Sequence, residues 1–379
     1  MIKRLVAFGG VLGILASGCG GKGPSLNINP VESNMYIGYK GDVSRAGFLD
    51  IDAGDMLSPL WQIKFRYPLY YSPSLAGDYI FQPGVDKKIH VIDINTGVEL
   101  AEIKVRRPIG ATPEMADSFM AVCEEGERSE ILVFNYLSGR MIWSARTYRL
   151  CLPPALYNNK IFWVDGNNTL NAARLYDGVK SWSLKFDSRF DCGPVLGDSL
   201  IFVATADSLL YAIDPVKGAI TWKAGGVGRT NSSPAYFGGC LYICDAGGKV
   251  AAYDAASGRK LWSHDDDTRL FYSPSVDDEG VYYGSGDGRF SKLNRTNGRV
   301  IWEFETGSPV RGTALVTTDI VVFWSLDYTV HILEKDTGRQ VMSYVATGMI
   351  SAAPVMFDNR LLIAAQDKYL YCFLMKEGN

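Results

Sequence analysis

Residues 253–262 read YDAASGRKLW: an aspartate, a Ser-Gly turn, and a tryptophan four residues after the glycine. The same pattern recurs along most of the chain. Its turn glycines are Gly97, Gly139, Gly178, Gly218, Gly258, Gly298 and Gly338, at spacings of 42, 39, 40, 40, 40 and 40 residues. A period of about 40 residues indicates a repeat architecture, in which each unit packs against the next.

Each unit predicts a β-hairpin around its glycine. The glycine supplies the positive φ that the turn requires, and an aspartate four residues earlier, such as Asp214 or Asp254, can accept hydrogen bonds from the turn backbone. The strand after the turn carries a tryptophan in five units: Trp143, Trp182, Trp222, Trp262 and Trp302. Ala101 and Met342 stand at this position in the other two units.

A second marker with the same period is a proline that follows a small or compact residue. It is found at Pro73, Pro113, Pro154, Pro194, Pro234, Pro274 and Pro354, with Ala314 at the one remaining position. After each marker the pattern predicts an apolar strand, a tight turn and a second strand, which together with the hairpin make four strands per unit. Four short strands in a repeat of this length are typical of a β-propeller blade.

The two ends of the chain each hold part of a blade. The last unit ends before its tryptophan strand, whereas residues 57–64 look like a tryptophan strand with no repeat before them. We expect this segment to pair with the last three strands, because closure of the ring removes exposed sheet edges. The sequence therefore predicts an all-β, eight-bladed β-propeller in which N- and C-terminal strands close one blade. A linear solenoid and a seven-bladed ring with a spare strand are the alternatives.

The N-terminal residues have the features of a targeting segment. Lys3 and Arg4 precede an apolar run at 5–15, and the small residues 16–18 precede Cys19. The run is shorter than the roughly 20 apolar residues of a membrane span, so a transmembrane anchor is the less favoured reading. The arrangement resembles a bacterial lipobox, which implies a signal peptide at 1–18, lipid attachment at Cys19 and a lipidated tether at 19–38. The propeller is expected at 39–379.

Composition and motifs argue against most kinds of chemistry. The formal net charge is −3 and no polybasic run is present, which disfavours nucleic acid as a partner. No metal-binding spacing, nucleophile elbow or phosphate loop occurs. We therefore predict no catalytic, cofactor-binding or metal-binding residues. The acidic runs at 265–267 and 277–279 are interpreted as solvated turns rather than as cation sites.

Six cysteines remain once Cys19 is assigned to the lipid. Cys240 and Cys244 lie four residues apart on one expected strand, roughly 13 Å from each other and beyond disulfide reach. Cys151 and Cys192 each precede a proline marker, so they open the inner strands of neighbouring blades and are the first pair to test. The interpretation we favour is nevertheless that the thiols are isolated and buried.

The repeat motif resembles that of the quinone-dehydrogenase-like (PQQ-repeat) propellers over 39–379. Residues 39–42, Arg45 and Gly47 are also similar to the lead-in of that family, in which an Asp and an Arg-x-Gly pack against the ring before its first strand. Together with the lipobox, the plan is most similar to the BamB-like lipoproteins within it. This resemblance implies a non-catalytic scaffold in the outer membrane, facing the periplasm. It would act as a monomer within a complex and support the assembly of outer-membrane β-barrel proteins.

The resemblance also implies a partner surface. In BamB-like proteins the loop between the third and fourth blades contacts the barrel-assembly protein BamA, and its arginine lies five residues before the proline marker. Arg189 stands at that place here, with Phe186 and Phe190 as the large apolar candidates. The loop is shorter and lacks the family's leucines. Unfolded β-barrel substrates are a further expected partner.

Two alternative functions remain at this stage. One is an exported PQQ-repeat propeller that binds another partner. The other is a PQQ-dependent dehydrogenase, a class that carries two adjacent cysteines over its cofactor. No Cys-Cys pair occurs in this chain, and the long insertions between blades of those enzymes are absent.

Overall fold

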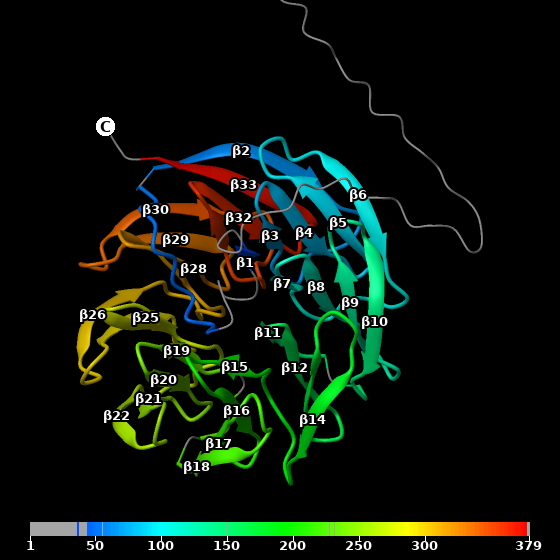
Figure 1. Cartoon of the computed structure of the whole chain (residues 1–379). Coiled ribbons are helices and arrows are strands. Elements are labelled where there is room, and N and C mark those ends of the chain that lie inside the picture. The colour runs from blue at the N-terminus through cyan, green and yellow to red at the C-terminus, as the bar shows by residue number, and fades with distance from the viewer. Residues whose placement is uncertain are drawn as a thin grey trace, which may run out of the picture.

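The computed structural model describes residues 44–54, 56–149, 151–226, 228–230 and 232–376, and the backbone of 36–37. Eight four-stranded antiparallel sheets are arranged around a central axis, and one of them gains a fifth strand (Figure 1). The prediction of an all-β, eight-bladed propeller is confirmed. The signal peptide, Cys19 and nearly all of the expected tether lie outside the described residues.

Each blade runs from an inner strand at the axis to an outer strand at the rim. The inner strands are β3 (Ser74–Ala76), β7 (Glu114–Ala116), β11 (Ala155–Tyr157), β15 (Val195–Leu196), β19 (Ala235–Phe237), β23 (Ser275–Val276), β27 (Leu315–Val316) and β31 (Val355–Phe357). The second strands are β4 (Tyr79–Pro83), β8 (Phe119–Cys123), β12 (Lys160–Asp165), β16 (Ile201–Thr205), β20 (Cys240–Cys244), β24 (Gly280–Gly284), β28 (Ile320–Trp324) and β32 (Arg360–Ala364).

The third and outer strands complete the blades. The third strands are β5 (Lys88–Asp93), β9 (Glu130–Asn135), β13 (Thr169–Arg174), β17 (Leu209–Ile213), β21 (Lys249–Asp254), β25 (Arg289–Asn294), β29 (Thr329–Glu334) and β33 (Tyr369–Lys376). The outer strands are β6 (Glu99–Lys104), β10 (Arg140–Arg146), β14 (Lys180–Lys185), β18 (Ile220–Ala224), β22 (Lys260–Asp265), β26 (Val300–Glu305), β30 (Gln340–Val345) and β2 (Met56–Lys64).

Burial follows from these positions. The second strands are apolar along their length, and β16 is buried at all of its residues, because both of its faces pack against neighbouring blades. Outer strands such as β14 alternate between exposed and half-buried residues, as expected when only one face is covered. The core is therefore divided into layers between adjacent blades.

The ring closes through strands from the two ends of the chain. β2 pairs antiparallel with β33, with Trp61 opposite Cys372 and Gln62 opposite Tyr371, as the sequence predicts. At the axis, the Ser72 hydroxyl donates to the Ala353 carbonyl over 2.9 Å and so links the first blade to the eighth. β2 and β33 are held together by strand pairing, and the described cysteines form no disulfide between them.

Each repeat tryptophan links its blade to the next one. The Trp222 indole Nε1 donates to the Ala255 carbonyl over 3.0 Å, and its ring covers the turn glycine Gly258. Equivalent indole bonds of 2.7–3.1 Å are made by Trp61, Trp143, Trp182, Trp262 and Trp302. The departure at Met342 now has a reason: the eighth blade takes its third and outer strands from opposite chain ends and so has no turn for a tryptophan to cover.

The segment before β2 runs through the central channel. The carbonyls of Ser44, Ala46 and Gly47 accept hydrogen bonds of 2.8–2.9 Å from the inner strands of blades five, six and seven in turn. Further upstream, β1 (Tyr36–Ile37) pairs with β3, although these two residues fall within the segment expected to be a tether. We call this segment, described at 36–37 and 44–54, the lead-in. It supplies backbone partners to inner strands that would otherwise be open edges.

Candidate functional site

Arg45 occupies the channel beside blades three to five. Its side chain is 1% exposed. Nη1 donates to the Ser233 hydroxyl over 3.1 Å, and Nη2 donates to the carbonyls of Pro153 and Pro154 over 3.0 Å each. A Cβ added to Gly193 would lie 3.2 Å from Nη1. The small residues that precede the proline markers therefore make room for one guanidinium group.

This arrangement does not fit a quinone cofactor at the same level of the channel. The guanidinium is directed at protein carbonyls and a hydroxyl, and the backbone of 44–47 is bonded to the inner strands of blades five, six and seven. A planar ring system would have to displace these contacts and leave buried polar groups without partners, which is costly. The channel residues therefore act as structural links between blades.

One rim of the propeller is formed by the loops that lead from each outer strand to the next inner strand. Their backbone is held in a repeating way. Phe186, eight residues before its proline marker, donates its N–H to the Asn168 carbonyl over 2.8 Å, and the Arg189 carbonyl accepts from Ala206 over 2.9 Å. Arg229 and Arg269 make the same carbonyl contact in the next two loops. We call this rim the loop face.

Phe186 and Phe190, the apolar residues expected at the partner surface, are buried in the core. They are 5% and 2% exposed, and their rings meet edge to face at 5.0 Å. Phe186 also packs against Tyr211. The repeat explains the burial of Phe190, because the residue four before the marker is apolar, buried and bridged to the next blade in other loops as well: Ile109, Leu270, Val310 and Ile350. Aligning the loops by their markers would have revealed this pattern in the sequence.

Arg189 is exposed and has equivalents in neighbouring loops. The residue five before the marker is an arginine in four consecutive loops, which lead into blades three to six: Arg149, Arg189, Arg229 and Arg269. All four are exposed, and we call them the arginine arc. Sequence reasoning singled out only Arg189, although the same spacing identifies the other three. The first, second, seventh and eighth loops have Pro68, Pro108, Pro309 and Met349 there.

Carboxylates accompany three members of the arc. Arg149 lies 2.7 Å from Glu127, and Asp191 lies between Arg189 at 3.1 Å and Arg229 at 3.5 Å. The side chains of these arginines are 57–68% exposed. Ion pairs this exposed contribute little to stability. The arginines therefore remain available to a partner.

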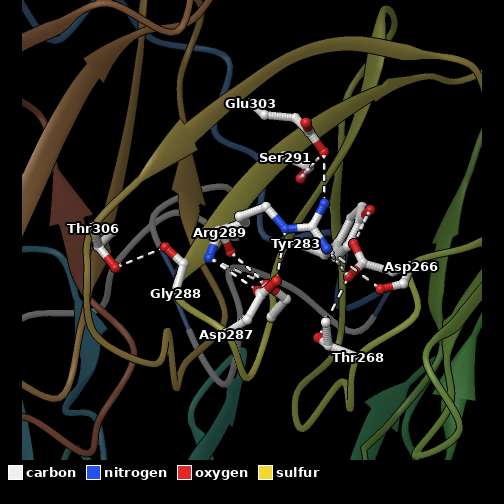
Figure 2. Close-up of polar contacts among 10 residues, drawn as sticks. Asp266, Thr268, Tyr283, Asp287, Gly288, Arg289, Ser291, Glu303 and Thr306 are labelled. Atoms are coloured by element: carbon white, nitrogen blue, oxygen red, sulfur yellow. Dashed lines mark hydrogen bonds and ion pairs between the residues drawn. The ribbon is translucent and has the colours of Figure 1, made fainter.

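Asp266 is buried, which corrects its interpretation as a solvated turn residue. It is 3% exposed, accepts from the Tyr283 hydroxyl over 2.6 Å and pairs with Arg289 at 3.0 Å (Figure 2). Arg289 also reaches Asp287 at 2.8 Å and Glu303 at 3.2 Å. Burial raises the pKa of Asp266, partly offset by its contacts with Tyr283 and Arg289. This network ties the loop between blades five and six to blade six.

Asp277 is likewise buried, at 1% exposure. It caps its own turn by accepting from the N–H groups of Glu279 and Gly280, and it accepts from the Tyr282 hydroxyl over 3.0 Å. Lys335 lies 3.3 Å away. The second acidic run therefore also contributes a structural carboxylate.

A histidine and two glutamates form one group that sequence reasoning missed. Within the described chain, ligand atoms of His90, Glu99 and Glu102 lie within 4.8 Å of one another. Lys88 is 2.6 Å from Glu102, and Asp86 and Glu99 flank the His90 ring at 3.3 and 2.7 Å. The lysine already supplies a positive charge to the carboxylates. These contacts account for the group as an ion-pair network on blade one.

The six described cysteines are present as thiols, and Cys151 does not face Cys192. The Cys192 sulfur is directed at the Ala204 carbonyl at 3.9 Å, whereas the Cys151 sulfur lies 3.2 Å from the Cys123 carbonyl. The structure therefore does not bring together Cys151 and Cys192, the two cysteines chosen from sequence spacing. Across the described ranges, no helix has the length and apolar character needed to span a membrane.

The family model described as outer membrane protein assembly factor BamB matches residues 57–183 and 166–322. The chain belongs to the BamB family. The match covers most of the ring and confirms the resemblance to BamB-like PQQ-repeat propellers. No curated protein sequence matches the chain.

Solved structures agree in fold with this assignment to the BamB family. BamB from Moraxella catarrhalis superposes with a TM-score of 0.71 at 16% identity, over 84% of this chain and 100% of the other. Quinohemoprotein alcohol dehydrogenase from Comamonas testosteroni gives a TM-score of 0.77 at 10% identity, over 93% of this chain and 82% of the enzyme. The computationally designed Ika8 protein gives 0.73 at 15% identity. At such identities the likeness shows the fold alone, because one scaffold carries different functions.

Proposed function

We propose that this chain is a non-catalytic scaffold lipoprotein that supports the assembly and insertion of outer-membrane β-barrel proteins through protein–protein contacts. It is held in the outer membrane by lipid on Cys19, faces the periplasm, and acts as a monomer within a complex. Its partner is a BamA-like barrel-assembly protein. Membership of the BamB family supports the role, and the arginine arc is the observation that carries the proposed contact.

The arc has the properties of a docking surface. Its four loops have their backbones bonded to the next blade, which limits the loop ordering that binding would require. Arginine is enriched at the energetic centres of protein interfaces and pairs with carboxylates in fixed geometry. The expected partner surface is therefore acidic. Phe186 and Phe190 contribute by holding the Arg189 loop in place.

Unfolded β-barrel substrates would use a different part of the molecule. They would add to an outer strand by β-augmentation, and β2 is one candidate, since its Met56 and Leu60 are 45% and 42% exposed. A groove of about 200 Å³ lies beside it and is lined in part by Trp61, Tyr344 and Phe373. Lysines on other outer strands, such as Lys180 and Lys185 of β14, oppose such pairing.

A pull-down with the lipidated full-length protein tests the proposed contact. Arg189→Glu combined with Arg229→Glu should reduce recovery of the barrel-assembly protein from solubilised membranes at least about tenfold, because like charges repel at the interface. Arg259→Glu is the matched control. Arg259 is also exposed but lies in a turn before β22, at the opposite rim. Equal recovery with both variants would remove the arc from the proposal, and recovery of another complex would favour the alternative binding propeller.

The dehydrogenase alternative has a separate test. The similarity to quinohemoprotein alcohol dehydrogenase motivates it, whereas the buried Arg45 opposes it. The full chain would be incubated with pyrroloquinoline quinone, calcium ions and primary alcohols in the presence of a redox dye. We expect no alcohol-dependent dye reduction, and reduction that requires both quinone and alcohol would overturn the non-catalytic assignment.

A further inference from the structure

Two cysteines meet where the second blade joins the loop to the third. Cys123 ends β8 and is 1% exposed, and Cys151 lies in the loop before β11 and is half-buried. The Cys151 sulfur lies 3.2 Å from the Cys123 carbonyl oxygen, between residues 28 apart in sequence. The Cys123 side chain is also close enough to hydrogen-bond to the Cys151 thiol. The two side chains are therefore neighbours, as a disulfide requires, since bonded cysteines have Cβ atoms about 3.8 Å apart.

Gly110 makes room for this approach. Its N–H donates to the same Cys123 carbonyl over 3.0 Å. A Cβ at Gly110 would come within 2.8 Å of the Cys151 sulfur. The loop from the first blade therefore lacks a side chain where the Cys151 thiol lies, and any larger residue would displace it.

The surroundings keep the Cys151 thiol protonated. A hydrogen bond with the Cys123 side chain, followed by burial, raises the pKa of Cys151. Glu125 and Tyr71 lie nearby, with the Tyr71 hydroxyl donating to Glu125 over 2.8 Å. A protonated thiol is a poor nucleophile, so exchange that begins with attack by Cys151 is expected to be slow.

We propose that Cys123 and Cys151 form a disulfide that joins the second blade to the loop leading into the third. The oxidant is a disulfide, either of a thiol–disulfide oxidoreductase or of a small thiol. The Cys151 thiolate attacks one sulfur of the oxidant and releases the other as a thiol, after which the Cys123 thiolate attacks Cys151 and releases the second thiol. Two electrons and two protons leave the cysteines and appear in the two thiols of the reduced oxidant.

The remaining cysteines do not offer a comparable pair. Cys240 and Cys244 lie at opposite ends of β20, too far apart for a bond. Cys372 lies within β33 in the eighth blade, and burial raises its pKa to about 12. Cys192 is directed at Ala204. Oxidation should therefore yield one defined bond rather than a mixture.

The disulfide would act on the loop that carries Arg149. Tyr148 and Arg149 both have positive φ, at 51° and 70°, a backbone conformation that non-glycine residues adopt at some cost. A bond at Cys151 would hold this strained loop against the second blade. The inference concerns the bond itself and is independent of the proposed function.

Oxidised glutathione acting on the reduced full-length protein tests the proposal. After oxidation, remaining thiols are alkylated under denaturing conditions and the protein is mapped by mass spectrometry without reduction. We expect one cross-linked peptide pair containing Cys123 and Cys151, lost on reduction, in the wild type and in the control variant Cys240→Ser. The Cys151→Ser variant should lack it.

The same samples give a second readout that does not depend on the variants. The oxidised wild type should unfold at a higher denaturant concentration than the reduced protein, because the cross-link restricts the unfolded chain. Alkylation of both Cys123 and Cys151 after oxidation would overturn the proposal. A cross-link between any other pair, or glutathione bound at Cys151 without a cross-link, would do the same.

Discussion

At the scale of single residues, the turn glycines meet two requirements at once. Gly258 has φ of 71°, in the region that favours glycine, and a Cβ there would lie 2.6 Å from the Trp222 ring. The same pair of constraints holds for Gly97 with Trp61 and for Gly338 with Trp302. The periodic glycine is therefore a packing requirement between blades as well as a turn requirement within one.

This double requirement predicts how much the addition of one methyl group at Gly258 destabilises the protein. Gly258→Ala should destabilise the protein by about 2–4 kcal/mol, because both backbone strain and a displaced indole contribute. Gly307→Ala is the control, since Gly307 has φ of 73° but nothing within 4 Å of the added atom. It should cost only about 1 kcal/mol. Chemical denaturation of both variants measures the difference, and equal losses would mean that the tryptophan contact contributes nothing.

At the scale of elements, one carboxylate adds to the backbone hydrogen bonds that fasten the lead-in to the seventh blade. Asp319 accepts from the N–H groups of Ala53 and Gly54 over 3.0 and 2.8 Å and from the Thr317 hydroxyl over 2.7 Å. Burial opposes ionisation of Asp319, but these donors and the neighbouring Asp52 hold its pKa below the ordinary value of 3.8. The ionised form thus favours the docked lead-in.

The lowered pKa of Asp319 gives a pH dependence with a defined sign. Its stabilising contribution is present above the unfolded pKa of 3.8 and is lost as pH falls through the lower folded value, because protons then bind the unfolded chain more readily. Asp319→Asn should remove part of the acid-induced decrease in urea stability. Asp358→Asn, in the equivalent turn of the eighth blade and largely exposed, is the control. The same decrease in all three proteins would contradict the assignment.

At the scale of the whole molecule, a continuous loop crosses every contact between neighbouring blades, including the one from β2 of the eighth blade into β3 of the first. The eighth blade is itself assembled from both chain ends, through pairing of β2 with β33. Trp61 sits at this seam, where its indole bonds to the Ile94 carbonyl over 2.8 Å. Integrity of the ring therefore depends on a non-covalent strand pair.

Substitution of two equivalent tryptophans can distinguish a loss of packing between blades from a loss of ring closure. Trp61→Ala and Trp222→Ala should each destabilise the protein by about 2–4 kcal/mol, since both rings cover a glycine of the next blade. Only Trp61→Ala weakens the closing strand and exposes the edge of β33, so only it should associate with rising concentration. Light scattering after size exclusion measures this. If both variants remain monomeric, β2 does not protect that edge.

Much of the architecture could be predicted from the sequence by itself. Glycine, proline and tryptophan at a period of 40 determine local backbone conformation and contacts between adjacent units, and the tryptophan strand at 57–64 predicts ring closure. Arg189 was singled out through the resemblance to BamB-like propellers, by its place five residues before a proline marker. The buried roles of Phe186 and Phe190 were missed, although a comparison of the eight loops indicates the burial of Phe190.

Other features were decided only by the tertiary structure. Arg45 meets Ser233 across 188 residues of sequence, Asp266 is buried because Tyr283 and Arg289 lie beside it, and Cys151 faces Cys123 rather than Cys192. The physical reason is that a repeat specifies how each unit packs on the next. It does not specify which polar groups are brought together at the axis and in the loops, where residues from several blades converge.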